Sequence, residues 1–439
     1  MDGITSTTVL KRFLEERGLD VKYYIPNRLK EGYGLSKEAI KQISEDNIDL
    51  MITVDCGITG IDEVEYANEL GIDVIITDHH EPIEILPNAI AVVDEKENLK
   101  YLDIVCLGTI ADIVPLVDEN RVIAKLGLKL IETGRNLAIK SIILNSGYKN
   151  ITSTSVSFGI APRINACGRM GFADEALKLF LSDSITEIQD LTSKLNEYNK
   201  ERQEKEKKIF EEAVKKIEEG NELQNDIIVL SGKGWHHGVI GIVSSKITEM
   251  YLKPSILLCE ENEICKGSGR SVPGLDLHEA LCATSNNLEK YGGHAMAIGL
   301  SLKKENLQKF KEEINKYVKN LKLETPKQVF DVDMCVSLKD LNIKAVNELK
   351  KLEPFGEANK MPIFVIKNLK IDSIRALSEG KHLKLRLKDE QYCIDAIGFN
   401  LGYLSNEYVI GDKVDIAGSL EINSFNGVDN IQINIKDIK

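Results

Sequence analysis

The segment Gly71–Pro82 constrains the fold more than any other part of the chain. Apart from Asp73, Ile72–Thr77 is a run of apolar and β-branched residues, and it ends abruptly in three polar residues, Asp78, His79 and His80. An apolar run of this length between a glycine and a proline is typical of a buried strand in a parallel sheet. In open α/β sheets, functional groups gather just beyond the carboxyl ends of such strands. The segment therefore predicts an α/β fold with a polar site at one edge of its sheet.

Acidic residues follow other apolar runs in the N-terminal part of the chain. Leu50–Val54 ends in Asp55, and the apolar stretch Asp103–Ala111 ends in Asp112. Carboxylates and imidazoles are ligands that can hold two divalent metal ions around a phosphate. The alternative for the Asp-His-His triplet by itself is a polar turn with local hydrogen bonds. The presence of several acids at the ends of apolar runs favours the metal site over the polar turn. One acid at such a position is common by chance, but three are much less so.

Four segments at these positions resemble the DHH phosphoesterase superfamily, and within it the exonucleases specific for single-stranded DNA. The matching segments are Asp2–Thr7, Val54–Gly57, Asp78–His80 and Gly108–Asp112. The resemblance extends over nearly the whole chain. It implies an α/β DHH domain with a mostly parallel sheet, joined by a long helix to an α/β DHH-associated domain, and a C-terminal β-barrel of the OB type.

We expect four parts along the chain, which follow from helical spacing, turn residues and this resemblance. They are a DHH domain at 1–182 that lacks its first strand, a connecting helix at 183–220, a DHH-associated substrate-binding domain at 221–325 and an OB-fold nucleic-acid-binding domain at 326–439. The stretch 199–208 is almost wholly charged or polar, so we expect the connecting helix to be exposed in its middle. Short strands with glycine and asparagine turns near the C-terminus suit a small barrel that binds single strands.

The resemblance implies roles for individual residues. The implied metal ligands are Asp2, Asp55, His79 and Asp112, and the implied catalytic residues are Asp78 and His80. The implied substrate-binding residues are Arg28, Arg163, Asn165, Arg169, Ser268, Arg270, Gly293 and His294. Arginine forks suit phosphate oxygens, and glycines allow the backbone to approach them closely. Without the resemblance, Gly159–Arg169 would be interpreted as an ordinary loop.

The ligand set indicates which metal ions to expect. It is rich in oxygen, contains few imidazoles and has no thiolates, and such sites select Mn²⁺ or Mg²⁺ rather than Zn²⁺. We therefore expect a two-metal site that activates water for attack on a phosphodiester.

The chain departs from the family in two places. Family members carry two further metal-binding aspartates immediately before the position of Asp2, and these would lie upstream of Met1. They also carry a longer segment where this chain has only the short link 94–100. We therefore expect either an N-terminal truncation of the sequence or the loss of half a metal site, and in addition an internal deletion after the Asp-His-His triplet. Both departures bear on whether the chain as given is active.

Composition narrows the class of protein. The chain has 439 residues, enough for two or three domains, and it shows no membrane span or signal peptide. Its eight cysteines are scattered without metal-type spacings, which indicates reduced thiols in a cytoplasmic protein. The net charge of −13 counts against a protein that coats nucleic acid by bulk electrostatics, but it is compatible with a nuclease that has a local basic groove.

The expected function is a metal-dependent exonuclease that hydrolyses single-stranded DNA from 5′ to 3′ in repair and recombination. Its expected partners are single-stranded DNA, a single-strand-binding protein and a helicase. The chain is expected to be a monomer and not to bind a membrane. One alternative is a phosphodiesterase for short oligonucleotides or cyclic dinucleotides. Another is a catalytically impaired protein that only binds single strands.

Overall fold

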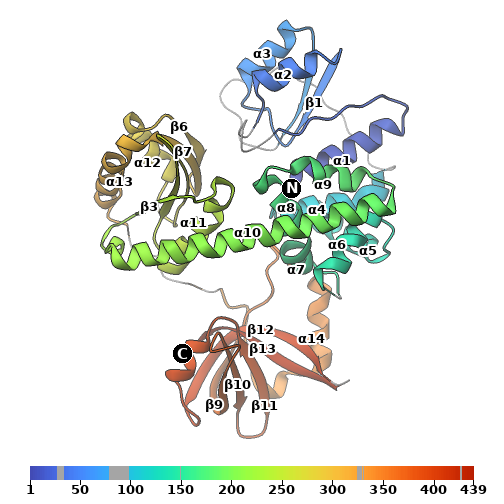
Figure 1. Ribbon diagram of the computed structural model, residues 1–439. Coiled ribbons are helices and arrows are strands. Elements are labelled where there is room, and N and C mark those ends of the chain that lie inside the picture. Colours follow the sequence, from blue (N-terminus) through green and yellow to red (C-terminus); the bar gives the residue numbers. More distant parts are fainter. Residues whose placement is uncertain (27–33, 79–97, 149, 324–328, 330, 426–427) are drawn as a thin grey trace. The chain divides into compact units, whose positions relative to one another are not determined.

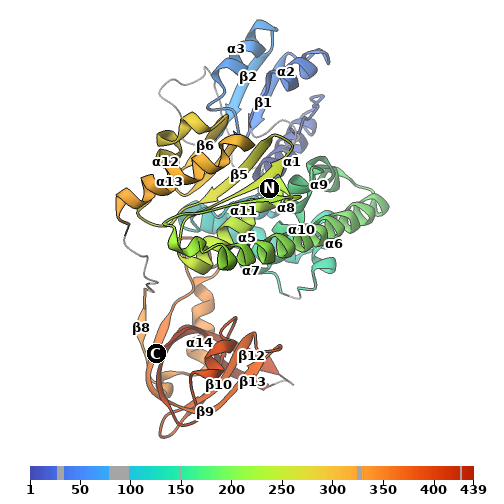
Figure 2. The same cartoon turned by 60° about the vertical axis from the view of Figure 1, so that its left-hand side comes forward.

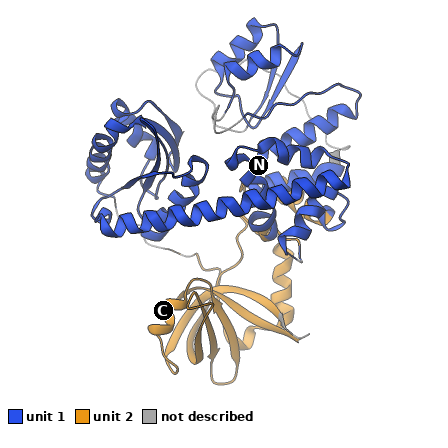
Figure 3. Ribbon diagram, in the orientation of Figure 1, with its two compact units in different colours: residues 1–111, 130–150, 155–327 blue, residues 112–129, 151–154, 328–439 orange. Residues whose placement is uncertain are grey.

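The structure is a computed structural model (Figures 1 and 2), and it describes residues 1–26, 34–78, 98–148, 150–323, 329, 331–425 and 428–439. The chain forms two compact units (Figure 3). The first contains residues 1–111, 130–150 and 155–327, and the second contains residues 112–129, 151–154 and 328–439. Helices α5 (Asp118–Glu132) and α7 (Ser153–Ser155) include residues of both units.

A small parallel sheet forms near the start of the first unit. Strand β1 (Leu50–Val54) pairs in parallel with β2 (Asp73–Thr77), and helix α3 (Ile61–Glu69) connects them. Their apolar faces form a core together with helix α2 (Lys37–Ser44). Its buried members are Ile40, Met51, Val64, Ala67, Ile72 and Val74. The expected strand before the Asp-His-His triplet and its parallel pairing are confirmed.

Helices make up most of the remaining DHH region. They are α1 (Asp2–Glu15), a 3-10 turn (Asn98–Tyr101), α4 (Leu102–Ala111), α6 (Leu137–Ser146), α8 (Ala161–Met170) and α9 (Ala173–Leu181). The prediction that Asp112 ends a strand is wrong, because the apolar stretch before it is α4. This helix is buried on several sides, including Ile104, Leu107 and Ile110. A helix buried all round lacks the polar stripe that would distinguish it from a buried strand.

The segment Gly159–Arg169 is helical rather than an ordinary loop. A π-helical turn (Val156–Ile160) leads directly into α8. Pro162 lies in the first turn of α8, where its fixed φ suits the helix and its missing N–H costs no hydrogen bond. Gly171 ends α8 with a left-handed φ of 91°.

The expected long helix is confirmed as α10 (Ile185–Glu219). The Ser184 side chain accepts a hydrogen bond from the Glu187 amide at its start, and Gly220 ends it. The expectation of an exposed middle is wrong for one face. Asn199 and Glu206 are buried there, and Glu206 forms ion pairs with Arg202 and with Lys246 of the following domain. Residues three and four apart share a helix face, so these polar side chains satisfy one another.

A five-stranded mixed sheet follows α10, in the order β3-β4-β5-β7-β6. Its strands are β3 (Ile228–Lys233), β4 (Ser255–Glu261), β5 (Ile264–Arg270), β6 (Lys290–His294) and β7 (Ala297–Lys303). One face packs against α10 and α11 (His237–Tyr251), and the other against α12 (Leu277–Ala283) and α13 (Leu307–Leu321). This is the expected α/β DHH-associated arrangement.

The second unit contains a closed five-stranded barrel. Its strands are β9 (Phe364–Leu377), β10 (His382–Lys388), β11 (Cys393–Gly398), β12 (Lys413–Phe425) and β13 (Val428–Ile438), with a short β8 (Met334–Cys335) beside β9. Pairing of β10 with both β9 and β11 closes the barrel. Helix α14 (Ile343–Leu349) packs against β12 and β13. The expected OB-type barrel is confirmed. Across the described residues, none of the helices is both long and apolar enough to cross a membrane.

Substitution in the barrel core should loosen the barrel. Leu385 on β10 is completely buried, so Leu385→Ala should lower the opening free energy of β9–β13 by about 2–5 kcal/mol through lost burial and a cavity. Amide hydrogen exchange of these strands measures this free energy. Val409 is 62% exposed, and Val409→Ala is the control, with an expected change within about 0.5 kcal/mol. Equal effects of the two substitutions would contradict the core assignment.

Candidate functional site

A backbone amide at the start of α1 binds the first strand-end carboxylate. Asp55 directly follows β1, and its Oδ2 accepts a hydrogen bond of 3.0 Å from the Gly3 amide. The first amides of a helix have no partners within the helix, and the helix dipole is positive at this end. The contact therefore suits a carboxylate and joins residues that are 52 positions apart in the chain.

Helix α4 lies against the same region of α1. A Cβ atom on Gly108 would lie only 2.6 Å from Thr5 Oγ1 and 3.2 Å from Asp2 Oδ1. The backbone of α4 thus approaches the side chains in the first turn of α1 more closely than any other residue type would allow. Because Asp2 precedes Gly3, the structure brings the predicted ligands Asp2 and Asp55 into one neighbourhood.

Asp78 lies at the same sheet edge as Asp55. The parallel register pairs Val54 with Thr77, and the two aspartates follow these residues. Asp78 Oδ2 accepts a hydrogen bond of 3.0 Å from the Ile58 amide. Burial, followed by the charges of Asp78 and Asp55, raises the pKa of the Cys56 thiol to about 11. Both carboxylates therefore lie near the Cys56 thiol.

The described residues supply only part of the expected metal site. Arg28, His79 and His80 lie outside the described residues. Asp112 is the first residue after α4 and belongs to the second unit. Within the described part of the chain, no group of three or more His, Cys, Asp or Glu side chains is arranged to hold a metal ion. Asp2, Asp55 and Asp78 nevertheless offer the oxygen donors that Mn²⁺ and Mg²⁺ prefer.

A second group of predicted residues lies around the first turns of α11. Ser268 and Arg270 alternate with buried residues on β5, so both side chains point to the same face of the sheet. A Cβ atom on Gly241 would lie 3.0 Å from Ser268 Oγ and 3.4 Å from Arg270 Nη2. Arg270 Nη1 also donates to Ser268 Oγ over 3.2 Å. The structure thus brings the serine and the arginine together beside α11.

Arg169 reaches the same helix from the end of α8. Its Nη1 donates a hydrogen bond of 3.1 Å to the Gly238 carbonyl. A Cβ atom on Gly238 would lie 2.3 Å from the Arg169 carbonyl oxygen, so the two backbones are in direct contact. Gly238 and Gly241 are one helical turn apart. Arg169, Ser268 and Arg270 therefore surround the N-terminal turns of one helix, where the helix dipole favours an anion.

The other predicted substrate-binding residues have separate surroundings. The Arg163 guanidinium donates to Asn196 Oδ1 over 2.7 Å and to the Gly159 carbonyl over 2.5 Å, which ties α8 to α10. Burial lowers the pKa of Arg163. Asn165 is half-buried on α8, and His294 is exposed at the end of β6. Gly293 has a φ of 132°, and a Cβ atom there would lie 2.3 Å from the Ala297 carbonyl oxygen.

Several positioning glycines escaped the sequence analysis as functional residues. The Gly3 amide donates to Asp55. The missing side chains of Gly108 and Gly238 allow Asp2 and Arg169 to approach the backbone closely. A glycine within a helical pattern beside a motif is the available signal, because glycine lowers helix stability and is kept there for a packing reason.

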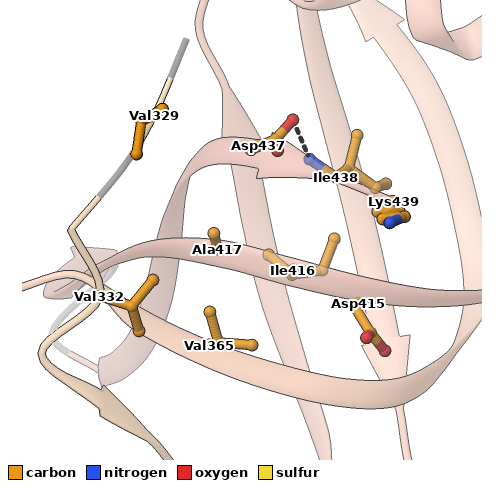
Figure 4. Close-up of a pocket in the computed structure, with 9 residues that line it drawn as sticks. All are labelled: Val329, Val332, Val365, Asp415, Ile416, Ala417, Asp437, Ile438 and Lys439. Atoms are coloured by element: carbon orange, nitrogen blue, oxygen red, sulfur yellow. Dashed lines mark hydrogen bonds between the residues drawn. The ribbon is translucent and has the colours of Figure 1, made fainter. Parts of the chain in front are cut away.

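A pocket of about 370 Å³ lies at the barrel (Figure 4). It is lined by Val329, Val332, Val365, Asp415, Ile416, Ala417, Asp437, Ile438 and Lys439. Asp437 Oδ1 accepts a hydrogen bond from the Ile438 amide, and Asp415 Oδ1 accepts one from the Asn368 amide. The pocket is mainly apolar and contains no predicted site residue.

Three family models match successive parts of the chain. The N-terminal domain of the DHH family matches residues 1–114, the DHHA1 domain matches residues 224–320, and the RecJ OB domain matches residues 332–437.

Curated relatives match almost the whole chain. The single-stranded-DNA-specific exonuclease RecJ of Bacillus subtilis is 37% identical over 469 residues, covering 99% of this chain and 60% of the relative. RecJ of Thermus thermophilus is 33% identical and covers 97% and 65%, and RecJ of Haemophilus influenzae is 32% identical and covers 98% and 85%. The chain thus spans less than two thirds of the first two relatives. The B. subtilis match is longer than the 439 residues of this chain, so that relative has residues that this chain lacks.

Solved structures give the same result. RecJ from T. thermophilus in complex with Mn²⁺ matches with a TM-score of 0.87 and 31% identity, and the match covers 100% of this chain and 67% of the other. The complex of the same protein with Mg²⁺ matches with a TM-score of 0.78 and 28% identity, over 100% and 65% of the two chains.

The contact between α8 and α11 can be tested with a pair of glycine substitutions. Gly238→Ala should lower the free energy of unfolding by about 1–3 kcal/mol, because the new methyl group meets backbone atoms that cannot rotate away. Gly168 lies inside α8, and the nearest atom to its Cβ position is 4.0 Å away. Gly168→Ala is the matched control and should be neutral or stabilising by up to about 1 kcal/mol. Thermal unfolding measures both; equal tolerance would refute the close contact.

Proposed function

The chain belongs to the RecJ family of DHH phosphoesterases, and on that premise we propose that it is a metal-dependent exonuclease that hydrolyses single-stranded DNA from 5′ to 3′. The observation that carries the proposal is the convergence of strand-end carboxylates. Asp55 is bound by the start of α1, and Asp78 lies at the same edge of the parallel sheet.

We assign the metal-binding role to the residues at this edge. Asp2, Asp55 and Asp78, together with His79 and Asp112, would hold Mn²⁺ or Mg²⁺, and similar structures from T. thermophilus contain these ions. When bound, such ions activate water and offset the charge of the phosphodiester. The chain contributes backbone amides that fix the carboxylates, one from Gly3 to Asp55 and one from Ile58 to Asp78. His80 would lie near the scissile phosphate.

We assign phosphate binding to the residues around α11. Arg169, Ser268 and Arg270 provide cationic and hydroxyl donors beside a helix N-terminus, which together suit the anionic backbone of DNA. Arg28, Arg163, Asn165, Gly293 and His294 remain proposed substrate-binding residues. The Arg163 guanidinium donates to the Asn196 side chain and to the Gly159 and Asn145 carbonyls, so it also holds neighbouring helices together.

We propose the domain boundaries 1–182, 183–220, 221–325 and 326–439, with the barrel binding single strands. The proposed partners are a single-strand-binding protein and a helicase that supply single-stranded DNA, and the proposed state is a monomer. We propose a cytoplasmic location. The free thiols of all eight cysteines are compatible with that compartment.

Digestion of labelled oligonucleotides tests the function. With Mn²⁺, the chain should release mononucleotides from 5′-labelled single-stranded DNA and leave duplex DNA intact, and EDTA should stop the reaction. Cleavage restricted to very short oligonucleotides would support a short-substrate phosphodiesterase instead. Binding without cleavage would support a catalytically impaired single-strand-binding protein.

Two substitutions separate chemistry from binding. Asp55→Asn should lower kcat by on the order of 100-fold, because a neutral amide would hold the metal ions that activate water less tightly. Arg270→Ala should raise KM by roughly tenfold through loss of a charge-assisted hydrogen bond to phosphate. Arg17→Ala, at an exposed arginine after α1, is the control for a general loss of positive charge. An unchanged kcat in Asp55→Asn would overturn the assigned site.

A further inference from the structure

Two aromatic rings form a parallel stack at the end of α8. The ring centroids of Phe172 and Tyr198 are 4.6 Å apart, and the ring planes differ by 8°. Phe172 connects α8 to α9, and Tyr198 lies on α10. Phe172 remains 45% exposed although Tyr198 covers one face of its ring. Phe172 therefore keeps a large solvent-accessible surface although it is part of the stacked pair.

The Tyr198 ring has charged neighbours on α9 and α10. Burial, followed by the nearby Glu175 carboxylate, raises the pKa of Tyr198 to about 12. Glu175 is itself paired with Lys194 over 3.0 Å. Tyr198 is half-buried on the long helix α10 and stacks on Phe172, so a third ring on Phe172 would meet a surface that is already ordered, at a small entropic cost.

The backbone of the outer residue is fixed as well. The Phe172 amide donates a hydrogen bond of 2.7 Å to the Cys167 carbonyl, and Gly171 before it has a left-handed conformation. An exposed phenylalanine by itself needs no explanation, since single apolar side chains are common on protein surfaces. An exposed ring that is backed by a parallel second ring is a more specific arrangement.

The ring pair is connected through the chain and through α11 to the residues assigned to phosphate binding. Phe172 follows Arg169 by three residues, and Arg169 contacts Gly238 of α11. One helical turn further along α11, Gly241 contacts Ser268 and Arg270. A connected series of contacts thus leads from the stacked rings to the predicted phosphate-binding side chains.

We propose that Phe172, backed by Tyr198, is a stacking platform for one unpaired base of the DNA strand. The inference rests on the proposed function and deepens it by assigning a base contact beside the phosphate contacts. Every base has a π-face, so such a platform binds without sequence preference. A base inside a duplex is already stacked on both sides, so the platform selects single strands over duplex DNA.

An abasic scan in the absence of divalent metal tests this proposal without cleavage. A set of 5′-phosphorylated oligonucleotides, each with one abasic site at a different position, is titrated against the full chain in EDTA. The wild type should bind about tenfold more weakly when the abasic site is at one particular position. Phe172→Ala should bind the intact oligonucleotide about tenfold more weakly and should lose the extra penalty at that position.

Matched variants distinguish stacking from a structural role. Phe172→Trp should restore both affinity and the abasic penalty, whereas Phe172→Leu keeps apolar volume without a ring and should behave like Phe172→Ala. Phe158 on the π-helical turn is 72% exposed, and Phe158→Ala is the control that should keep the penalty. Thermal unfolding of each variant checks that the fold is kept.

The outcomes separate this proposal from the function on which it rests. A wild type that neither binds nor digests single-stranded DNA would overturn both. A wild type that digests single-stranded DNA but shows no position-specific abasic penalty would overturn the stacking role only. Retention of the full penalty in Phe172→Ala would also overturn the stacking role, because the lost affinity would then be independent of the base.

Discussion

The hydrogen bond from the Gly3 amide to the Asp55 carboxylate joins the first helix of the chain to the end of its first described strand. The helix start offers amides without helical partners and a favourable dipole, and the strand end offers the charge that they stabilise. Gly108 of α4 allows a second backbone to reach the same turn beside Asp2. The arrangement of the candidate metal site depends on this junction, since the carboxylates come from distant parts of the chain.

Helix α11 plays a comparable part for the DHH-associated region. Gly238 contacts Arg169 of α8, and Gly241 lies beside Ser268 and Arg270 of β5. The buried Glu206 carboxylate on α10 pairs with Arg202 of the same helix and with the half-exposed Lys246 of α11, which links α11 to the long connecting helix. A buried carboxylate left without a cation is costly, so the pairs of Glu206 favour a single arrangement of α10 and α11.

Patterns that are strong over many residues predicted their elements correctly. The apolar run Ile72–Thr77, the long connecting helix and the C-terminal barrel all have the predicted type. The errors occur where burial hides periodicity or where polar groups pair. Helix α4 has too little polar surface to show its period, and the polar middle of α10 buries Glu206 because two cations neutralise it.

The amino-acid sequence alone was enough to predict the family and the order of its domains, because motifs and hydrophobic periods are local properties. It could not determine that Asp2 and Asp55 meet through Gly3, or that Arg169 contacts the turn of α11 next to Ser268 and Arg270. It also gave no sign that Phe172 and Tyr198 stack. These contacts join residues that are distant in the chain, and only packing in three dimensions decides which side chains become neighbours.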